Sequence, residues 1–426
     1  MKKTRTLILM VVALFLGYLP WYNFSAVMSY IAKDFHFTTV DQGMIISAFQ
    51  LGYVVIVLIT GWLADKVGPK KVVAWATLMC AITATLFPFV AKDFTTTLIM
   101  RLLTGLSAGA IYAPGMSLLS NWFAPAERGK AIGAYTAGLV AAYAGGYFVA
   151  APIASAYSWR AGMLATSIPV FIAAIIVFFF ITDRPEEQTN FDGATGLMGD
   201  GAAAPLRGPR PAPEGGYKGP IFITGSYMGH MWELYAFWGW IGAYMMASCV
   251  AAGYSTAQAV AKGGLLAAII ILVGAPAVYL MGLAADKWGR TKAITVAATC
   301  SLVPEFFFGY MFGMPLWTVV VVGLWIGFWV IADSAIYKAG LTDMISEKVR
   351  GTVLGIQSAV GFSMTILAPL AFGFVLQKLN GPVPSIQATV WGPAFLMLGV
   401  GALIAPVMAM ATRKVPQAKL MTSGKM

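Results

Sequence analysis

Long runs of apolar residues, separated by short polar segments, dominate the pattern along this chain. Twelve runs approach or exceed the roughly 20 residues that a helix needs to cross the hydrocarbon core of a bilayer. A transmembrane β-barrel would instead show alternating segments of about 10 residues, so these continuous runs predict an all-α membrane protein. The predicted spans are 6–29, 43–64, 72–90, 95–118, 129–153, 160–182, 220–247, 256–284, 293–312, 316–339, 352–377 and 390–411.

One long polar segment, 183–219, divides the twelve spans into two groups of six. It is rich in Gly, Ala and Pro and carries several charges, a composition that is typical of a flexible linker rather than a packed core. We therefore expect a six-helix bundle in 1–182, a cytoplasmic linker in 183–219, a second six-helix bundle in 220–412 and a cytoplasmic tail in 413–426.

Composition and charge agree with a chain in lipid. Hydrophobic residues make up 59% of the sequence and charged residues 11%, against about 25% charged in soluble domains. The net charge of +11 would suit a nucleic-acid partner, but most of the 28 Lys and Arg residues fall in segments that share one side if the N-terminus is cytoplasmic. This asymmetry is the positive-inside pattern. It predicts a multi-pass protein of the cell (inner) membrane with both termini cytoplasmic, and no nucleic-acid partner.

Two short motifs recur in both halves of the sequence. Asp65 and Asp286 stand 221 residues apart in one motif, and Arg128 and Arg350 stand 222 apart in the other, so chance is an improbable cause. The matching segments are Gly61-Trp-Leu-Ala-Asp65-Lys-Val-Gly68-Pro-Lys70 with Gly282-Leu-Ala-Ala-Asp286-Lys-Trp-Gly289-Arg290, and Arg128-Gly-Lys-Ala-Ile-Gly133 with Arg350-Gly-Thr-Val-Leu-Gly355.

The first motif has a mechanical interpretation. Glycine permits the tight turn between two helices, whereas Asp65 and Asp286 would oppose the dipole of the helix that each one ends. Each aspartate therefore calls for a positive partner or the N-terminus of a neighbouring helix, a contact that would latch a cytoplasmic gate. The alternative is that the motifs only orient insertion and cap helices.

The doubled Gly-x-Leu-Ala-Asp-x-x-Gly pattern resembles the signature loop of the major facilitator superfamily. The resemblance covers nearly the whole chain, because the twelve spans and the central linker fit as well. It implies two bundles around a midplane cavity, with spans 1, 4, 7 and 10 lining the cavity and alternating access by rocking of the halves.

Two segments near span 4 carry the resemblance further. Arg101-Leu-Leu-Thr-Gly105 looks like the superfamily's Arg-x-x-x-Gly element, and the segment from Pro114 to Lys130 is similar to the anion:cation symporter branch. That branch usually has an acid where this chain has Ala108. The Gly-Pro element typical of drug antiporters is missing from span 5.

Ionisable residues inside the spans are the first candidates for chemistry, because a charge in the bilayer centre is costly. Glu233, near the middle of span 7, would take up and release the coupling proton or bind substrate, and His230 lies on the same helix face. Arg101 would capture an anion or bond to backbone carbonyls, and Asp333 would be a second coupling acid or part of the inner gate. Each acid and His230 could also be a packed, hydrogen-bonded residue. Glu305, in the peripheral ninth span, is expected at the membrane interface.

Aromatic and amide side chains on the cavity spans are the second group of candidates. Amphipathic rings can wall a small-solute site and offer it a donor, although the same rings can serve packing or the membrane interface. The candidates are Trp21, Tyr22, Asn23, Gln50, Trp232, Tyr235, Trp329 and Gln357.

These observations predict a secondary active transporter that takes up a small organic anion, such as a carboxylate, together with protons, and we expect it to be a monomer. The alternative is proton-driven efflux of amphiphilic or drug-like compounds. An enzyme is not expected, because the sequence has no nucleophile–base set, metal signature or nucleotide loop. The 23 Met residues would suit copper, but they show no repeated paired spacing, so we expect neither a metal nor a cofactor.

Overall fold

The computed structural model describes residues 2–184, 216–346, 350–382 and 390–424, and the regular structure in these ranges is helical. The helices of the first half are α1 (Lys2–Tyr18), α2 (Asn23–Phe35), α3 (Thr39–Val67), α4 (Pro69–Val90), α5 (Phe94–Ala108), α6 (Tyr112–Trp122), α7 (Pro125–Ala156), α8 (Trp159–Ser167) and α9 (Pro169–Phe180). Those of the second half are α11 (Lys218–Ala251), α12 (Thr256–Leu272), α13 (Gly274–Trp288), α14 (Arg290–Phe308), η1 (Gly309–Met311), α15 (Leu316–Trp329), α16 (Ser334–Met344), α17 (Arg350–Asn380), α18 (Gly392–Ala402), α19 (Ile404–Arg413) and η3 (Pro416–Gly424).

These helices form 12 segments that are long and apolar enough to span a membrane, which confirms the predicted multi-pass, all-α class. The segments are Lys2–Phe35, Thr39–Val67, Pro69–Val90, Phe94–Trp122, Lys130–Ala156, Trp159–Phe180, Lys218–Ala251, Thr256–Trp288, Arg290–Met311, Leu316–Met344, Val353–Asn380 and Gly392–Arg413. Most of these segments are longer than the predicted spans, because the helix continues into the polar residues that follow the apolar run.

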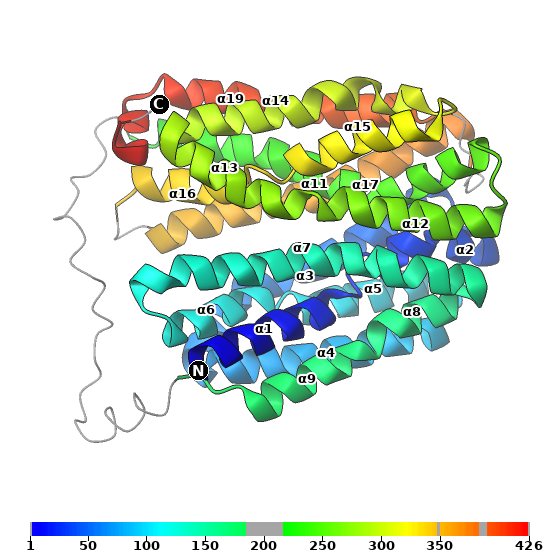
Figure 1. Ribbon diagram of the computed structural model, residues 1–426, viewed down its shortest axis with the longest axis horizontal. Coiled ribbons are helices and arrows are strands. Elements are labelled where there is room, and N and C mark those ends of the chain that lie inside the picture. Colours follow the sequence, from blue (N-terminus) through cyan, green and yellow to red (C-terminus); the bar gives the residue numbers. More distant parts are fainter. Residues whose placement is uncertain (1, 185–215, 347–349, 383–389, 425–426) are drawn as a thin grey trace.

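The helices gather into two bundles that lie one above the other in Figure 1, with α1 to α9 in the lower bundle and α11 to α19 in the upper. Both described ends of the chain lie on the left of that view, as an even number of spans requires. We call this side the terminal side and the opposite one the distal side. The predicted linker bounds stay a prediction, because 185–215 lie outside the described residues.

The two bundles are joined on the distal side, where α3 packs against α17 and α7 against α12. A Cβ added to Gly373 would lie 2.3 Å from the Thr39 carbonyl oxygen, so the backbones of α17 and α3 touch at this glycine. Hydrogen bonds cross the same seam from Thr39 Oγ1 to Gly373 O (3.0 Å), Val40 N to Gln377 Oε1 (3.1 Å), Ser47 Oγ to Ile366 O (2.6 Å) and Ser155 Oγ to Ala257 O (2.6 Å).

The terminal side of α3, α7, α13 and α17 is open. A Cβ added to any of four glycines there would meet no described atom within 4 Å. On the distal side, by contrast, a Cβ added to Gly43 or Gly373 would lie within 3 Å of a backbone oxygen of the other half. These open positions are Gly61, Gly133, Gly282 and Gly355. The structure is therefore a conformer that is closed on its distal side and separated on its terminal side.

Candidate functional site

The first span is broken between α1 and α2, and Arg101 from α5 holds the break. Pro20 lies in this break, where the helical hydrogen-bond ladder is interrupted. The Arg101 guanidinium donates to the carbonyl oxygens of Pro20 (Nη1, 3.0 Å) and Trp21 (Nη2, 2.9 Å). In a bilayer such freed carbonyls need a hydrogen-bond donor from within the protein, and Arg101 provides the hydrogen bonds that water would make in a soluble protein.

The surroundings of Arg101 are otherwise aromatic and polar but contain no carboxylate contact that the structure records. Its guanidinium carbon lies 4.3 Å from the centre of the Phe49 ring, and Nη1 lies 3.5 Å from Asn23 Oδ1. Asn23 also donates to Thr166 Oγ1 at 2.9 Å, so it is bonded within its own half. Two of the predicted site residues thus brace the broken span, and a role in anion binding stays a prediction for both.

Buried aromatic rings fill the boundary between the halves next to this break. Trp21 lies 4.8 Å from Tyr143 and 6.4 Å from Tyr235 by ring centres, and Tyr22 lies 6.2 Å from Trp238. The Trp21 indole nitrogen, the Tyr22 hydroxyl and the Trp238 indole nitrogen are buried without a hydrogen-bond partner among the described residues. Buried donors normally find a partner, so this group can offer hydrogen-bond donors to a bound solute.

Span 5 contributes residues to this aromatic boundary that the sequence analysis did not select. Tyr143 packs against Trp21, and Tyr147 donates to the Trp238 carbonyl oxygen at 2.8 Å, which ties α7 to α11 across the two halves. The signal was present in the sequence, because two tyrosines four residues apart share one face of a helix otherwise rich in Gly and Ala.

A hydrogen-bonded network lies in the second half, where His230 on α11 meets the break between α15 and α16. His230 Nδ1 lies 2.9 Å from Asp333 Oδ1, and its Nε2 lies 2.7 Å from the Ser334 hydroxyl. The Tyr337 hydroxyl donates to Asp333 Oδ2 at 2.7 Å. Both His230 and Asp333 are about 2% exposed, so the structure joins two predicted site residues from different spans into one buried pair.

Glu233 faces a different neighbour, although it lies three residues from His230. Its carboxylate lies near Ser301 on α14 and near Asp333, close enough to both for an electrostatic interaction. One carboxylate oxygen, Oε1, is buried without a partner among the described residues. The two polar residues of α11 therefore point to neighbouring but separate groups.

Glu305 on α14 is fully buried, which corrects the expectation that it lies at the membrane interface. Its helix packs against α15, α16, α18 and α19, so this face of α14 lies inside the bundle rather than against lipid or headgroups. Neither of its carboxylate oxygens has a hydrogen-bond partner among the described residues, and Glu233 is close enough to interact with it electrostatically.

The other predicted site residues lie apart from these groups. The Trp232 indole packs over Gly401 within the second half. Trp329 packs at an angle against Trp325 and edge-on against Phe328, in an apolar recess between α14 and α15. Gln50 and Gln357 are buried, with amide atoms that lack a partner among the described residues.

The repeated turns between helices have the geometry that their glycines predict. Gly68 and Gly289 end α3 and α13 with φ of 91° and 95°, a backbone region that favours glycine. Asp183 Oδ1 accepts from the Lys70 backbone N–H at 2.7 Å and so caps α4, whereas Arg290 Nε pairs with Asp343 Oδ2 at 2.6 Å.

The predicted latch acids stand at the open side. Asp65 and Asp286 are both exposed on the terminal side. The Arg128 side chain lies outside the described residues. The latch therefore stays a prediction.

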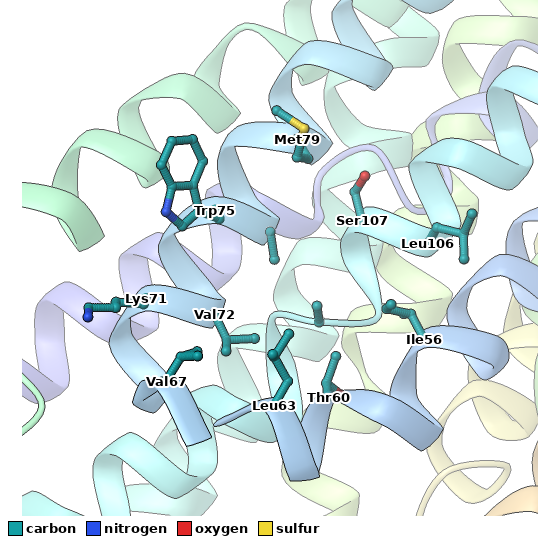
Figure 2. Close-up of a pocket in the computed structure, with 12 residues that line it drawn as sticks. Ile56, Thr60, Leu63, Val67, Lys71, Val72, Trp75, Met79, Leu106 and Ser107 are labelled. Carbon is teal, nitrogen blue, oxygen red and sulfur yellow. The ribbon is translucent and has the colours of Figure 1, made fainter. Parts of the chain in front are cut away.

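A separate groove of about 490 Å³ runs along the first half alone, between α3, α4 and α5. Figure 2 shows its apolar walls, including Ile56, Leu63 and Trp75, with Lys71 at one edge. It contacts none of the buried acids and does not involve the second half. We therefore place the candidate site at the aromatic boundary and the adjoining acids of α11, α14 and α16.

Comparison with known proteins decides the family. The family model described as "Major Facilitator Superfamily" matches residues 10–261, which is more than half of the chain. The chain belongs to the major facilitator superfamily. Membership makes it a membrane transporter rather than an enzyme.

Relatives within the superfamily match over nearly the full length of the chain. A protein named probable sulfoacetate transporter SauU, from Cupriavidus necator, is 23% identical and aligns over 94% of this chain and 93% of its own. A hexuronate transporter from Bacillus subtilis is also 23% identical, over 90% of this chain and 88% of its own.

Solved structures of the superfamily share the fold. A bacterial homologue of the human lysosomal transporter Spinster, in an inward-facing and unoccupied conformation, has a TM-score of 0.72 at 14% identity, with 97% of both chains covered. A D-xylose-proton symporter has a TM-score of 0.73 at 14% identity, with 97% of this chain and 98% of that chain covered. These likenesses establish the superfamily architecture of two six-helix bundles.

Proposed function

We propose that this transporter takes up a small organic anion, such as a carboxylate or a sulfonated acid, together with protons. The observation that carries the coupling part of the proposal is the buried group of three acids and one histidine in the second half, at His230, Glu233, Glu305 and Asp333. Ionisable groups this deep in a transmembrane bundle are costly, and they mark proton relays when no fixed charge neutralises them.

The substrate class rests on the relatives and on the donors at the aromatic boundary. The relatives that match over most of the chain carry names of transporters for sulfoacetate and hexuronate, both of them acids. The unpartnered donors of Trp21, Tyr22 and Trp238 suit the oxygens of such solutes. Arg101 lies directly behind this wall, and its charge would favour an anion there.

The direction of access follows from the expected topology. If the basic segments face the cytoplasm, the terminal side is cytoplasmic and the structure is an inward-open conformer. Closing the terminal side would bring Gly61, Gly133, Gly282 and Gly355 into contact between the two halves. The halves would then touch on the terminal side as they now touch on the distal side.

Transport in proteoliposomes tests the proposal. An inwardly directed proton gradient is expected to drive accumulation of glucuronate, D-galactonate or sulfoacetate by the wild-type protein. Glu233→Gln is expected to abolish gradient-driven accumulation while counterflow of the same anion persists, because exchange needs no net proton movement. Glu127→Gln, at an exposed residue paired with Lys3, is the matched control and should keep both activities.

The alternative of amphiphile efflux is tested with the same protein. A thermal-shift screen of carboxylates, sulfonates, sugars and amphiphilic cations should give stabilisation by acids. Stabilisation by amphiphilic cations alone would contradict uptake of an anion and favour efflux.

A further inference from the structure

Glu233 and Glu305 form a buried acid pair that lacks the compensation that ionised carboxylates require. Glu305 is 0% exposed and Glu233 is 1% exposed. Three of their four oxygens, both of Glu305 and Oε1 of Glu233, have no hydrogen-bond partner among the described residues. A buried carboxylate normally accepts several hydrogen bonds or pairs with a cation.

Helix geometry places the two acids opposite each other. Ser301 and Glu305 are four residues apart on α14 and so share one face of that helix. Phe237, one turn after Glu233 on α11, lies 6.2 Å from Phe308 by ring centres, and Phe308 is three residues after Glu305 on α14. The two acids therefore lie about one turn back along the same helix contact, within electrostatic range of each other. The pair thus joins α11 to α14.

The groups around the pair do not neutralise it. Asp333 and Tyr337 of α16 are the further titratable groups that interact with Glu233, and His230 on α11 is bonded to Asp333 and Ser334 instead. Two like charges that interact with each other in an apolar interior cannot both persist. One positive charge must therefore reside on the pair.

A proton fits this place better than a metal ion. In the ranges that the structure describes, no group of three or more His, Cys, Asp and Glu residues is placed to hold a metal ion. The Ser301 hydroxyl is oriented toward the carbonyl oxygens of Ala297 and Ala298 on its own helix, so it adds little to a metal's oxygen shell. Metal cations such as Ca²⁺ and Mg²⁺ need six or so oxygen ligands.

We propose that Glu233 and Glu305 hold one exchangeable proton between them, as a carboxylic acid facing a carboxylate. This inference rests on the proposed proton-coupled function and adds Glu305, on the ninth span, to the residues that carry the coupling proton. Taking up the proton forms one O–H bond on either carboxylate, and releasing it returns the proton to water. The pair is distinct from the His230–Asp333 pair, which has its own hydrogen bonds.

Infrared spectroscopy of the purified, substrate-free protein in lipid nanodiscs tests the pair directly. The wild type at neutral pH is expected to show the C=O stretching band of a protonated carboxylic acid, shifted when H₂O is replaced by D₂O. The band should weaken in Glu233→Gln and in Glu305→Gln and disappear in the double variant. It should be unchanged in Asp93→Asn, whose carboxylate is exposed and hydrogen-bonded to Thr96.

Two results would overturn the shared proton. One is a band that persists in the double variant, which would place the protonated acid elsewhere. The other is a band that appears only when Na⁺ is replaced by choline, which would assign the site to a metal cation. Size-exclusion profiles of each variant show whether it is folded, and Glu305→Leu gives a second variant without an acid at this position.

Transport assays distinguish failure of the shared-proton inference from failure of the proposed function on which it rests. Glu305→Gln is expected to lose gradient-driven accumulation of glucuronate or D-galactonate while counterflow continues. If the wild type accumulates none of the tested acids but shows the band, the proposed function fails and the proton pair stands. If the wild type accumulates them and Glu305→Gln does so equally well, Glu305 does not carry a coupling proton.

Discussion

The two halves of this transporter hold buried charge in opposite ways. In the first half Arg101 is 3% exposed and gives its guanidinium to two backbone carbonyls at the break in span 1. In the second half Glu233 and Glu305 are equally buried but leave three of four carboxylate oxygens without a partner among the described residues. The difference teaches that a buried charge with partners serves structure, whereas buried acids without partners are suited to exchanging a proton.

The largest expected effect comes from removing the partnered charge. Arg101→Ala would leave the Pro20 and Trp21 carbonyls without donors inside the bilayer, and each buried acceptor left unsatisfied costs about 1–3 kcal/mol. Thermal unfolding of the purified protein should show a large loss of stability. Arg101→Lys keeps the charge but loses the forked guanidinium donor, so its thermal stability should lie between those of the wild type and Arg101→Ala.

That prediction also tests whether Arg101 serves mainly to bind the anion. A substrate-binding arginine would be replaceable at little cost to the fold and at great cost to uptake. Unchanged thermal stability in Arg101→Ala, with uptake lost, would contradict the comparison between the halves.

A much smaller change in thermal stability is expected when Glu305, the acid without a partner, is replaced. Glu305→Gln keeps the shape of the side chain and offers Glu233 an amide N–H in place of the shared proton, and Glu305 has no other hydrogen-bond partner among the described residues. Replacing buried charges by neutral groups of similar volume is often neutral or stabilising, so we expect a change of less than about 1 kcal/mol, or a gain. The measurement is the same thermal unfolding curve.

A matched control for this prediction is Asp333→Ala. It removes an acid that His230 and Tyr337 both contact, so it should destabilise the second half where Glu305→Gln does not. A loss as large for Glu305→Gln as for Asp333→Ala would mean that Glu305 has a structural partner after all.

The fold could be predicted from the sequence much further than the site. Apolar run lengths were enough for the twelve spans, because a bilayer forces each run into a helix of similar length. The partners of the buried charges were not predictable, since they come from tertiary packing between distant segments. Arg101 and Pro20 are 81 residues apart, and His230 and Asp333 meet across the break in span 10.

Glu305 and Glu233 show where the sequence reasoning reached its limit. The peripheral place of the ninth span suggested an interfacial Glu305, but burial depends on which face of α14 packs against α16, α18 and α19. Helical spacing predicts that His230 and Glu233 share one face of α11. That face borders two helices, so His230 meets the start of α16 whereas Glu233 lies near α14. Spacing along one helix cannot specify which neighbour each side chain meets.

The smallest expected effect concerns a carboxylate that has partners but is fully exposed, in the turn before α5. The backbone N–H of Thr96 donates to Asp93 Oδ1 at 2.8 Å, and this bond holds the pKa of Asp93 below its ordinary value of 3.8. A lowered folded-state pKa means that the cap stabilises the protein above the ordinary value, and that this contribution is lost as pH falls through the lowered pKa. Asp93→Ala should therefore lower the thermal midpoint slightly at neutral pH, and the gap to the wild type should close in acid. A gap that persists unchanged well below pH 3.8 would mean that the charge of Asp93 is not what stabilises the cap.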